Sequence, residues 1–277
     1  MACIQPVTRI PGVELGDWVQ KADFAILPLG AVEWHGPHLP LGTDLILCEG
    51  FARAAAEAGE FTAVLYPPVP YAACPGKTRG YPGTVAVRPE TALAYLIDVL
   101  EGILATGFVR VLLLNAHDGN MSMARAAMEW VSGRHRCSLL LVNWWQLVTP
   151  EETAAQGLFA GHSGRGHGGP YEGSVTWAFA PEAVRPGAAR EIVPRPALAT
   201  DRPHVLVESC PSPWEGYAGL IGQMDREKGE RIVREATGHL GRLIRAWLAA
   251  PLPDPPPGAG SHSAGPHTAG PHLSAGR

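Results

Sequence analysis

Residues 24–44 read FAILPLGAVEWHGPHLPLGTD, and this stretch decides how the rest of the chain is interpreted. Its first six residues are a short apolar run, which predicts a buried strand with Pro28 near its end. Glu33 and His35 follow, and they would point the same way because side chains alternate between faces in an extended chain. Asp44 lies far enough along the chain to fold back towards them through a loop of Gly and Pro. Carboxylate, imidazole and carboxylate form a ligand set for divalent metals such as zinc or manganese.

The same stretch has a second interpretation, as a polar loop in front of a helix. A helix is expected after Thr43 and Asp44, and Asp44 would then be its N-cap. On these residues alone, both interpretations stay open.

The chain beyond residue 44 alternates between helical and strand patterns. Helices are predicted over 46–59, 88–107, 121–132, 174–179 and 227–249, and strands over 61–66, 108–114 and 138–143. Short strands are also predicted around Ile192 and over 205–207, within an irregular Pro-rich segment. The alternation predicts an α/β fold in a single domain, with a mostly parallel sheet flanked by helices on both faces.

Composition separates this domain from the end of the chain. Residues 1–250 are expected to form the domain, and residues 251–277, rich in Pro, Gly and His, a disordered tail that cannot bury a core. Of the 277 residues, 46% are hydrophobic and 17% charged, which is typical of a globular protein. The formal charge of −4 and the lack of a Lys/Arg stripe exclude nucleic acid as an expected partner. No signal peptide and no apolar run of ~20 residues are recognised, so we expect a cytoplasmic protein without a membrane partner.

Two polar loops are predicted at the same edge of the sheet. Sites in parallel α/β sheets lie in the crevice beyond the C-terminal strand ends. The loop Glu33–Asp44 follows one strand, and the loop that carries His117 follows the strand 108–114. His117 either binds a ligand or ion, or is a hydrogen-bonded residue that caps the strand. The shared position favours a functional site.

A third polar group lies in the Gly-rich loop 156–173. Glu172 either supplies a carboxylate to the start of a helix or is the last protein ligand of a metal centre. His167 lies beside it and is the residue we expect to transfer a proton. Residues 164–169 match GxGxxG but follow no convincing strand, so a dinucleotide site is rejected.

The five cysteines contain no CxxC pair, which argues against a zinc ribbon. Cys48, on a predicted helix, and Cys74, in the long loop 67–82, are the nucleophiles that a thiol hydrolase would need. Neither has a His nearby in the sequence, so a thiol hydrolase is the least favoured hypothesis.

Five motifs, in order along the chain, resemble the creatininase (creatinine amidohydrolase) family. They are EWHGPHLP at 33–40 with Asp44, YPGT at 81–84 with RPET at 88–91, NAHDGN at 115–120, HGGPYEGS at 167–174 and EKG at 227–229. The tail, residues 251–277, is not part of this resemblance. It implies a creatininase-like fold, a small-molecule substrate and a homo-oligomer, commonly a hexamer.

The resemblance also implies two divalent metals, zinc or manganese with iron as a further option. Glu33 and His117 would hold one metal, His35 and Glu172 the other, and Asp44 would bridge them. Such a pair would share a hydroxide, which becomes the nucleophile, and would polarise a carbonyl.

His167 matches the substrate-facing His of the family, and would donate a proton to the leaving nitrogen. Trp145, or its neighbour Trp144, falls where creatininase has an aromatic residue after its strand. Asp118, where the family usually has Gly, is expected at the substrate. The segment 163–166 lacks the aromatic residue that creatininase uses to cover its substrate. The metal ligands are thus retained, whereas the substrate contacts differ.

We therefore predict a binuclear metal-dependent amidohydrolase that cleaves a non-peptide C–N bond in a small, cyclic amide. The alternative is a biosynthetic member of the family: a deformylase, a precursor-peptide hydrolase or a hydrolase of a cyclic sugar derivative, with Arg165 and Asp118 as substrate contacts. A non-catalytic binding or assembly member is a further hypothesis. The intact ligand set argues against it, because unused carboxylates and imidazoles are costly to bury together.

Overall fold

The structure is a computed structural model that describes residues 3–57, 61–73, 77–159, 164–195 and 209–256. Five parallel strands form one sheet. In spatial order they are β1 (Cys3–Pro6), β3 (Thr62–Leu65), β2 (Phe24–Leu29), β4 (Arg110–Asn115) and β5 (Ser138–Asn143). The predicted parallel sheet is confirmed.

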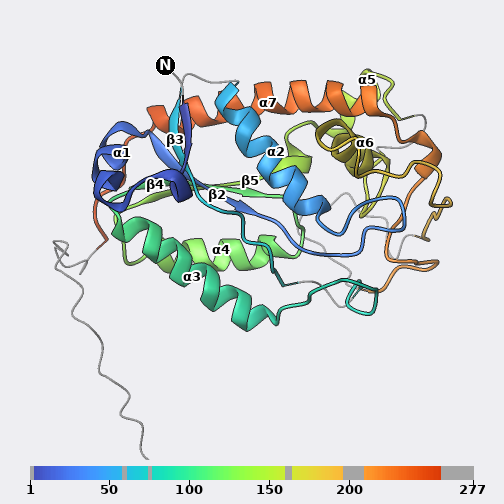
Figure 1. The fold of residues 1–277 in the computed structure, drawn as a ribbon, viewed down its shortest axis with the longest axis horizontal. Coiled ribbons are helices and arrows are strands. Elements are labelled where there is room, and N and C mark those ends of the chain that lie inside the picture. The colour runs from blue at the N-terminus through green and yellow to red at the C-terminus, as the bar shows by residue number, and fades with distance from the viewer. Residues whose placement is uncertain (1–2, 58–60, 74–76, 160–163, 196–208, 257–277) are drawn as a thin grey trace, which may run out of the picture.

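Helices cover both faces of the sheet (Figure 1). One face carries α2 (Thr43–Glu57), α6 (Pro170–Phe179) and α7 (Arg226–Ala249), and the other carries α3 (Pro89–Ala105) and α4 (Asn120–Ser132). Strand β2 shows why both faces are covered: its side chains point alternately to the two faces and enter different cores. Phe24 and Ile26 pack in the core beneath α2 and α7, whereas Ala25 and Leu27 pack in the core beneath α3 and α4. The α/β fold with two covered faces is therefore confirmed.

Several short elements were not predicted. They are β1, α1 (Leu15–Lys21), α5 (Pro150–Ala155) and the 3-10 turns Val7–Arg9, Gly12–Glu14, Trp144–Gln146 and Ile221–Gln223. Elements of three to seven residues are too short for the periodicity of a helix or strand to show. Helix α5 alone carries a local signal, a capping box in which Thr149 and Glu152 bond to each other's backbone amides.

Other predicted elements differ from the structure in their bounds or their type. The helix expected over 174–179 begins at Pro170, so that Glu172 lies inside its first turn. Ile192 forms only an isolated antiparallel bridge with Gly219, and the strand predicted over 205–207 lies outside the described residues. The predicted tail lies outside them from residue 257 onward, so its disorder stays a prediction. No helix of the described part of the chain is long and apolar enough to cross a membrane.

The strand order places the crevice beside β2. From β2 the chain moves to β3 on one side and then returns to β4 on the other side. The helix after β2, α2, lies on one face of the sheet, and the helix after β4, α4, lies on the opposite face (Figure 1). The loops that follow β2 and β4 therefore meet at a topological switch point, where ligands bind in open α/β sheets.

Helices α6 and α7 pack tightly against each other at Gly229. A Cβ atom at this position would lie 1.9 Å from the backbone oxygen of Ser174. We therefore predict that Gly229→Ala forces the helices apart and lowers the free energy of unfolding by about 1–3 kcal/mol. Thermal or urea denaturation would measure the loss.

Gly238→Ala, in the same helix, is the matched control. Its Cβ would meet only the Arg242 guanidinium, at 3.6 Å, and Ala is favoured over Gly in a helix by about 0.5–1 kcal/mol. This variant should be as stable as the wild type or more so. Equal losses for the two variants would contradict the close packing of α6 on α7.

Candidate metal centre

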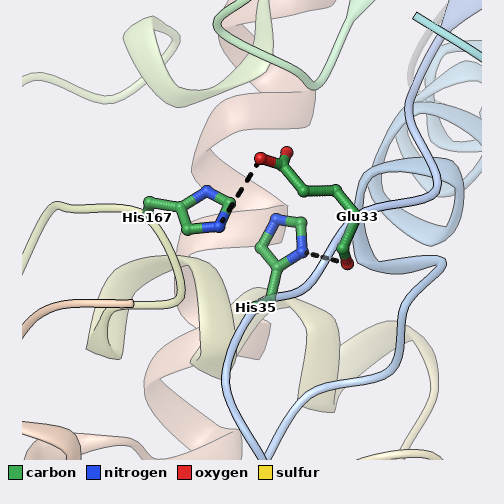
Figure 2. A group of neighbouring side chains, drawn as sticks. All are labelled: Glu33, His35 and His167. Carbon is green, nitrogen blue, oxygen red and sulfur yellow. Dashed lines mark hydrogen bonds and ion pairs between the residues drawn. The ribbon is translucent and has the colours of Figure 1, made fainter. Parts of the chain in front are cut away.

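The loop after β2 brings two of the predicted ligands into the crevice. Glu33 and His35 are buried, at 0% and 1% exposure, and Figure 2 shows their side chains converging. The chain reverses directly after His35 at Gly36, which has φ +86° and whose Cβ would lie 2.8 Å from the His38 ring. Helix α2 begins at Thr43, so Asp44 is not the N-cap. Its carboxylate lies inside the first turn and is buried, with 1% exposure.

The loop after β4 is held by a network of buried amide side chains. Asn115 Oδ1 accepts from the backbone N–H of His117 at 3.1 Å and from Asn120 Nδ2 at 3.2 Å. Asn120 Nδ2 also donates to the carbonyl of Gly30 at 3.1 Å, and Asn115 Nδ2 donates to Asn143 at 2.9 Å. The loop of His117 is therefore fixed to the ends of its two neighbouring strands, β2 and β5.

The last predicted ligand comes from the first turn of α6. Glu172 Oε2 accepts from the backbone N–H of Gly168 at 2.6 Å. The carbonyl of Gly168 in turn accepts from His38 Nε2 at 2.9 Å. His38 thus supports the loop in front of Glu172.

The five predicted ligands form two groups that share Asp44. Potential ligand atoms of Glu33, Asp44 and His117 lie within 4.8 Å of one another, and the same holds for His35, Asp44 and Glu172. His117 Nδ1 lies 3.0 Å from Glu33 Oε2 and 3.2 Å from Asp44 Oδ2. His35 Nε2 lies 3.2 Å from Asp44 Oδ1 and 3.8 Å from Glu172 Oε2. This is the division that the family resemblance implied.

The hydrogen bonds of the two imidazoles test whether a cation fits. His35 Nδ1 lies 3.0 Å from the carbonyl oxygen of Glu33 (Figure 2), which can only accept, so Nδ1 donates. Its Nε2 faces the carboxylates of Asp44 and Glu172. His117 Nε2 lies 3.4 Å from the carbonyl of Ala73, with Nδ1 facing carboxylates.

A lone pair that faces a carboxylate needs a proton or a metal cation between them. Glu33 Oε2, His35 Nε2 and Asp44 Oδ2 are buried without a hydrogen-bond partner, which is costly unless a cation satisfies them. The residues therefore fit divalent metals of the zinc or manganese type.

The charges of the centre shift the pKa values of its members. Burial alone would lower the pKa of His35, but Asp44 and Glu172 raise it to about 10. Burial would also lower the pKa of His117, but Asp44 and Glu33 raise this pKa well above its ordinary value. Burial, together with the negative charge of Asp44, raises the pKa of Glu172 to about 7 despite the nearby His35.

His167 lies at the edge of the centre. Its ring stacks on His35 with 4.1 Å between centroids, and its Nε2 lies 3.9 Å from Glu33 Oε1 (Figure 2). Nε2 donates to the carbonyl of Trp34 at 2.8 Å, because a carbonyl can only accept. Burial and the positive charge of His35 lower the pKa of His167 to about 4. The ring is therefore neutral at pH 7, with Nδ1 as its proton acceptor.

The predicted substrate contacts occupy different environments. Asp118 is exposed, and only its neighbour His117 points into the ligand groups. Arg165 donates to the carbonyls of Trp145 and Val148, and its guanidinium lies 4.3 Å from the centroid of Tyr171. The structure thus joins Arg165 to Trp145. Contact of Asp118, Trp145 or Arg165 with a substrate stays a prediction.

Two residues near the centre were missed from the sequence. Thr78 is buried and donates to Glu33 Oε1, and Trp214 lies with its ring 6.0 Å from that of His167. Both come from irregular segments that carry no periodic pattern. The only available signal was the unusual length of the loop 67–82, which is typical of functional loops.

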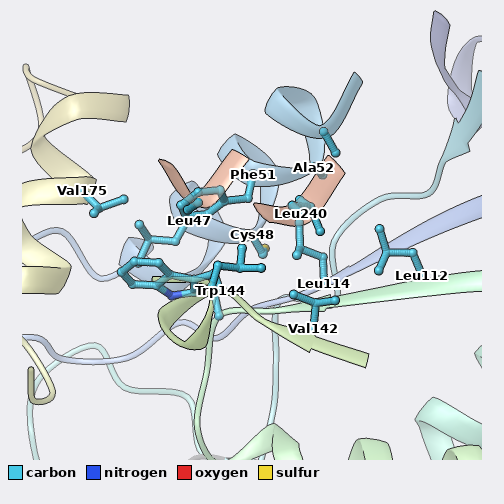
Figure 3. Close-up of a cluster of buried hydrophobic side chains, with 14 of the residues drawn as sticks. Leu47, Cys48, Phe51, Ala52, Leu112, Leu114, Val142, Trp144, Val175 and Leu240 are labelled. Carbon is cyan, nitrogen blue, oxygen red and sulfur yellow. The ribbon is translucent and has the colours of Figure 1, made fainter. Parts of the chain in front are cut away.

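The ligand-bearing helices α2 and α6 share one buried core (Figure 3). Trp144 lies at its centre, stacked 5.4 Å from Phe51 of α2 and 5.2 Å from Tyr171 of α6. The core therefore fixes the distance between the helix ends that carry Asp44 and Glu172. Cys48 is buried in the same core, and burial raises the pKa of its thiol, so it is no nucleophile. Cys74 lies outside the described residues.

The chain is similar to several known proteins in sequence and in fold. A family model described as creatinine amidohydrolase matches residues 11–244. The chain is 37% identical over 238 residues to the mycofactocin precursor peptide peptidase of Mycolicibacterium smegmatis, covering 81% of this chain and 85% of that protein. It is 26% identical over 261 residues to the 3-dehydro-scyllo-inosose hydrolase of Thermotoga maritima, covering 84% of this chain and 80% of that protein. The solved structure "Creatininase Mn" superposes with a TM-score of 0.74 at 23% identity, over 90% of this chain and 100% of that one.

The fold and the match over residues 11–244 define a hydrolase class, and the chain belongs to the creatininase family. The resemblance seen in the sequence is thereby confirmed. The two relatives act on chemically different substrates, so membership alone leaves the substrate undetermined.

The raised and lowered pKa values can be measured in the protein after chelator treatment. We predict that the ring of His35 stays doubly protonated well above pH 7, whereas His38 and His167, each with a pKa of about 4, are neutral at pH 7. Nitrogen-15 NMR of the imidazoles, assigned with His→Asn variants, would show this. Because a metal ion must displace the proton on His35, metal affinity should fall as pH falls. Titration of His35 near its ordinary pKa of about 6.5 would contradict the predicted charge arrangement.

Proposed function

We propose that this protein is a binuclear metal-dependent hydrolase that cleaves an amide C–N bond. The observation that carries the proposal is the shared carboxylate of Asp44, which belongs to two groups of ligands at once. Buried oxygen and nitrogen atoms of these groups, which contact only one another, support the binding of cations there. Manganese and zinc both suit the mixture of carboxylate and imidazole ligands.

Divalent ions held there would supply Lewis acidity, which activates water and polarises the substrate's carbonyl group. Glu33, Asp44 and Glu172 would hold these ions with the two imidazoles, and Thr78 orients Glu33 through its hydrogen bond. His167 moves the proton: its Nε2–H is retained by the carbonyl of Trp34, so Nδ1 accepts a proton and passes it to the leaving nitrogen.

We infer further that the amide belongs to a short peptide. The relative with 37% identity is named as a precursor peptide peptidase, and the segment before His167 supports a similar substrate. Gly164 and Gly166 offer no side chain to cover the site, and Arg165 is bonded to backbone carbonyls. Residues 164–166, the described part of the loop before His167, thus place no side chain over the site, which suits a chain-like substrate.

The small cyclic amide predicted from the sequence is the second candidate, favoured by the description of the matching family as creatinine amidohydrolase. A homo-oligomer and a cytoplasmic location stay predictions of the sequence.

Metal dependence and proton transfer can be tested separately. We predict two divalent ions per wild-type chain and loss of peptide hydrolysis after chelation, with recovery on adding manganese or zinc. Asp44→Asn should lose both metal and activity, because the variant removes the shared carboxylate. His167→Gln should keep its metal content while kcat falls by about 10²–10⁴-fold, since only proton transfer is lost. Metal content by mass spectrometry and kcat on the same preparation distinguish the two variants.

Several outcomes would contradict the proposal. A wild-type protein without bound divalent ions, or Asp44→Asn with unchanged activity, would show that the centre is not catalytic. Loss of activity on thiol alkylation would favour the thiol hydrolase. Hydrolysis of creatinine or other cyclic amides, without hydrolysis of peptides, would replace the peptide by the second candidate.

A further inference from the structure

A short segment, residues 214–218, lies beside the candidate metal centre and is fastened to it at both ends. Trp214 Nε1 donates to the carbonyl of Lys77 at 3.0 Å, in the loop that also carries Thr78. At the other end, the backbone N–H of Ala218 donates to the carbonyl of His167 at 2.9 Å. The position of the segment is therefore set by the loops that hold the site.

Two aromatic side chains, Trp34 and Tyr81, pack against this segment, and together with Trp214, which belongs to it, they are called the aromatic wall. Trp34 Nε1 donates to the carbonyl of Glu215 at 3.0 Å, and its ring stacks on Tyr81 with 5.9 Å between centroids. Tyr81 Oη in turn donates to the carbonyl of Trp214 at 3.4 Å. Gly216, with φ +75°, makes this approach possible, because a Cβ there would lie 2.3 Å from Trp34 Cδ1.

The wall is not needed to complete a hydrophobic core. Trp34, Tyr81 and Trp214 belong to none of the four buried clusters of the described residues. The indole of Trp214 is partly exposed, although its Nε1 is held by a hydrogen bond. A rigid, partly exposed indole beside a polar centre is the kind of surface that binds an apolar ligand group at low entropic cost.

The neighbours of His167 show which part of a substrate would meet this indole. One side of the His167 ring stacks on the metal-facing His35, and the Trp214 ring lies 6.0 Å away at an angle of 40°. His167 thus has both the ligand groups and the Trp214 indole as near neighbours. A leaving nitrogen within reach of His167 carries its substituent next to Trp214.

We propose that Trp214 is a specificity-determining residue, which packs against an apolar or aromatic substituent on the leaving-amine side of the scissile bond. This inference rests on the proposed cleavage of a C–N bond, and it deepens that function by assigning the chemistry of the leaving group. An aromatic leaving side chain gains buried apolar area and ring contact that a hydroxymethyl group lacks. We expect a difference of about tenfold in affinity from a partly buried aromatic ring.

The test uses two kinds of probe on the manganese-loaded protein. Phenethylamine and ethanolamine imitate an aromatic and a polar leaving amine, and calorimetry gives their affinities without any reaction. Acetyl-Ala-Gly-Phe-amide and acetyl-Ala-Gly-Ser-amide give the corresponding preference in kcat/KM. Wild type should favour the aromatic member of each pair about tenfold. Trp214→Ala should remove this preference and Trp214→Phe should keep most of it, both with unchanged metal content.

Trp130→Ala is the matched control, since Trp130 lies in the last turn of α4 with 48% exposure and stacks on Arg134. It should retain the full preference. Equal or absent binding of the two amines by wild type, or an unchanged preference in Trp214→Ala, would overturn the inference. Peptide cleavage without dependence on Trp214 would leave the proposed function standing and the inference wrong. Trp214-dependent binding of phenethylamine without peptide cleavage would show that Trp214 binds an apolar group, and that the proposed cleavage of a peptide is wrong.

Discussion

The structure depends on one buried carboxylate that serves two imidazoles. Asp44 is withdrawn from water and lies 3.2 Å from both His35 and His117. A carboxylate in such a place is costly unless positive charge surrounds it, because a low dielectric strengthens uncompensated charge. The two imidazoles are held with a ring nitrogen towards it by backbone carbonyls. The arrangement is thus prepared for cations before any substrate is present.

The rest of the fold keeps this arrangement rigid. The candidate ligand side chains come from the loops after β2 and β4 and from the first turns of α2 and α6. A single core around Trp144 packs the two helices together, and the amides of Asn115 and Asn120 fasten the strand ends. Sites built on packed strands and helices hold their geometry better than sites on free loops, as metal chemistry requires.

In the function proposed above, different parts of the chain govern the reaction and the choice of substrate. The ligands come from the regular elements and the loops directly attached to them, whereas the aromatic wall comes from the segments around residues 34, 81 and 214. Relatives with this fold are named for a precursor peptide and for a scyllo-inosose derivative, two chemically distant substrates. In the proposed function, the aromatic wall can change without moving a ligand, because the two come from different segments of the chain.

The sequence by itself determined the α/β alternation, the two covered faces and the set of residues at the strand ends. These features are local: a strand or helix of sufficient length shows its period, and the position after an apolar strand marks the crevice. Only the tertiary structure decided that Asp44 lies inside a helix, that Thr78 supports Glu33 and that Trp214 lies beside His167. Thr78 and Glu33 are 45 residues apart, and Trp34 and Glu215 are 181 apart. Contacts between irregular segments so distant in the chain depend on how the whole sheet and its loops pack, and no local pattern of residues encodes them.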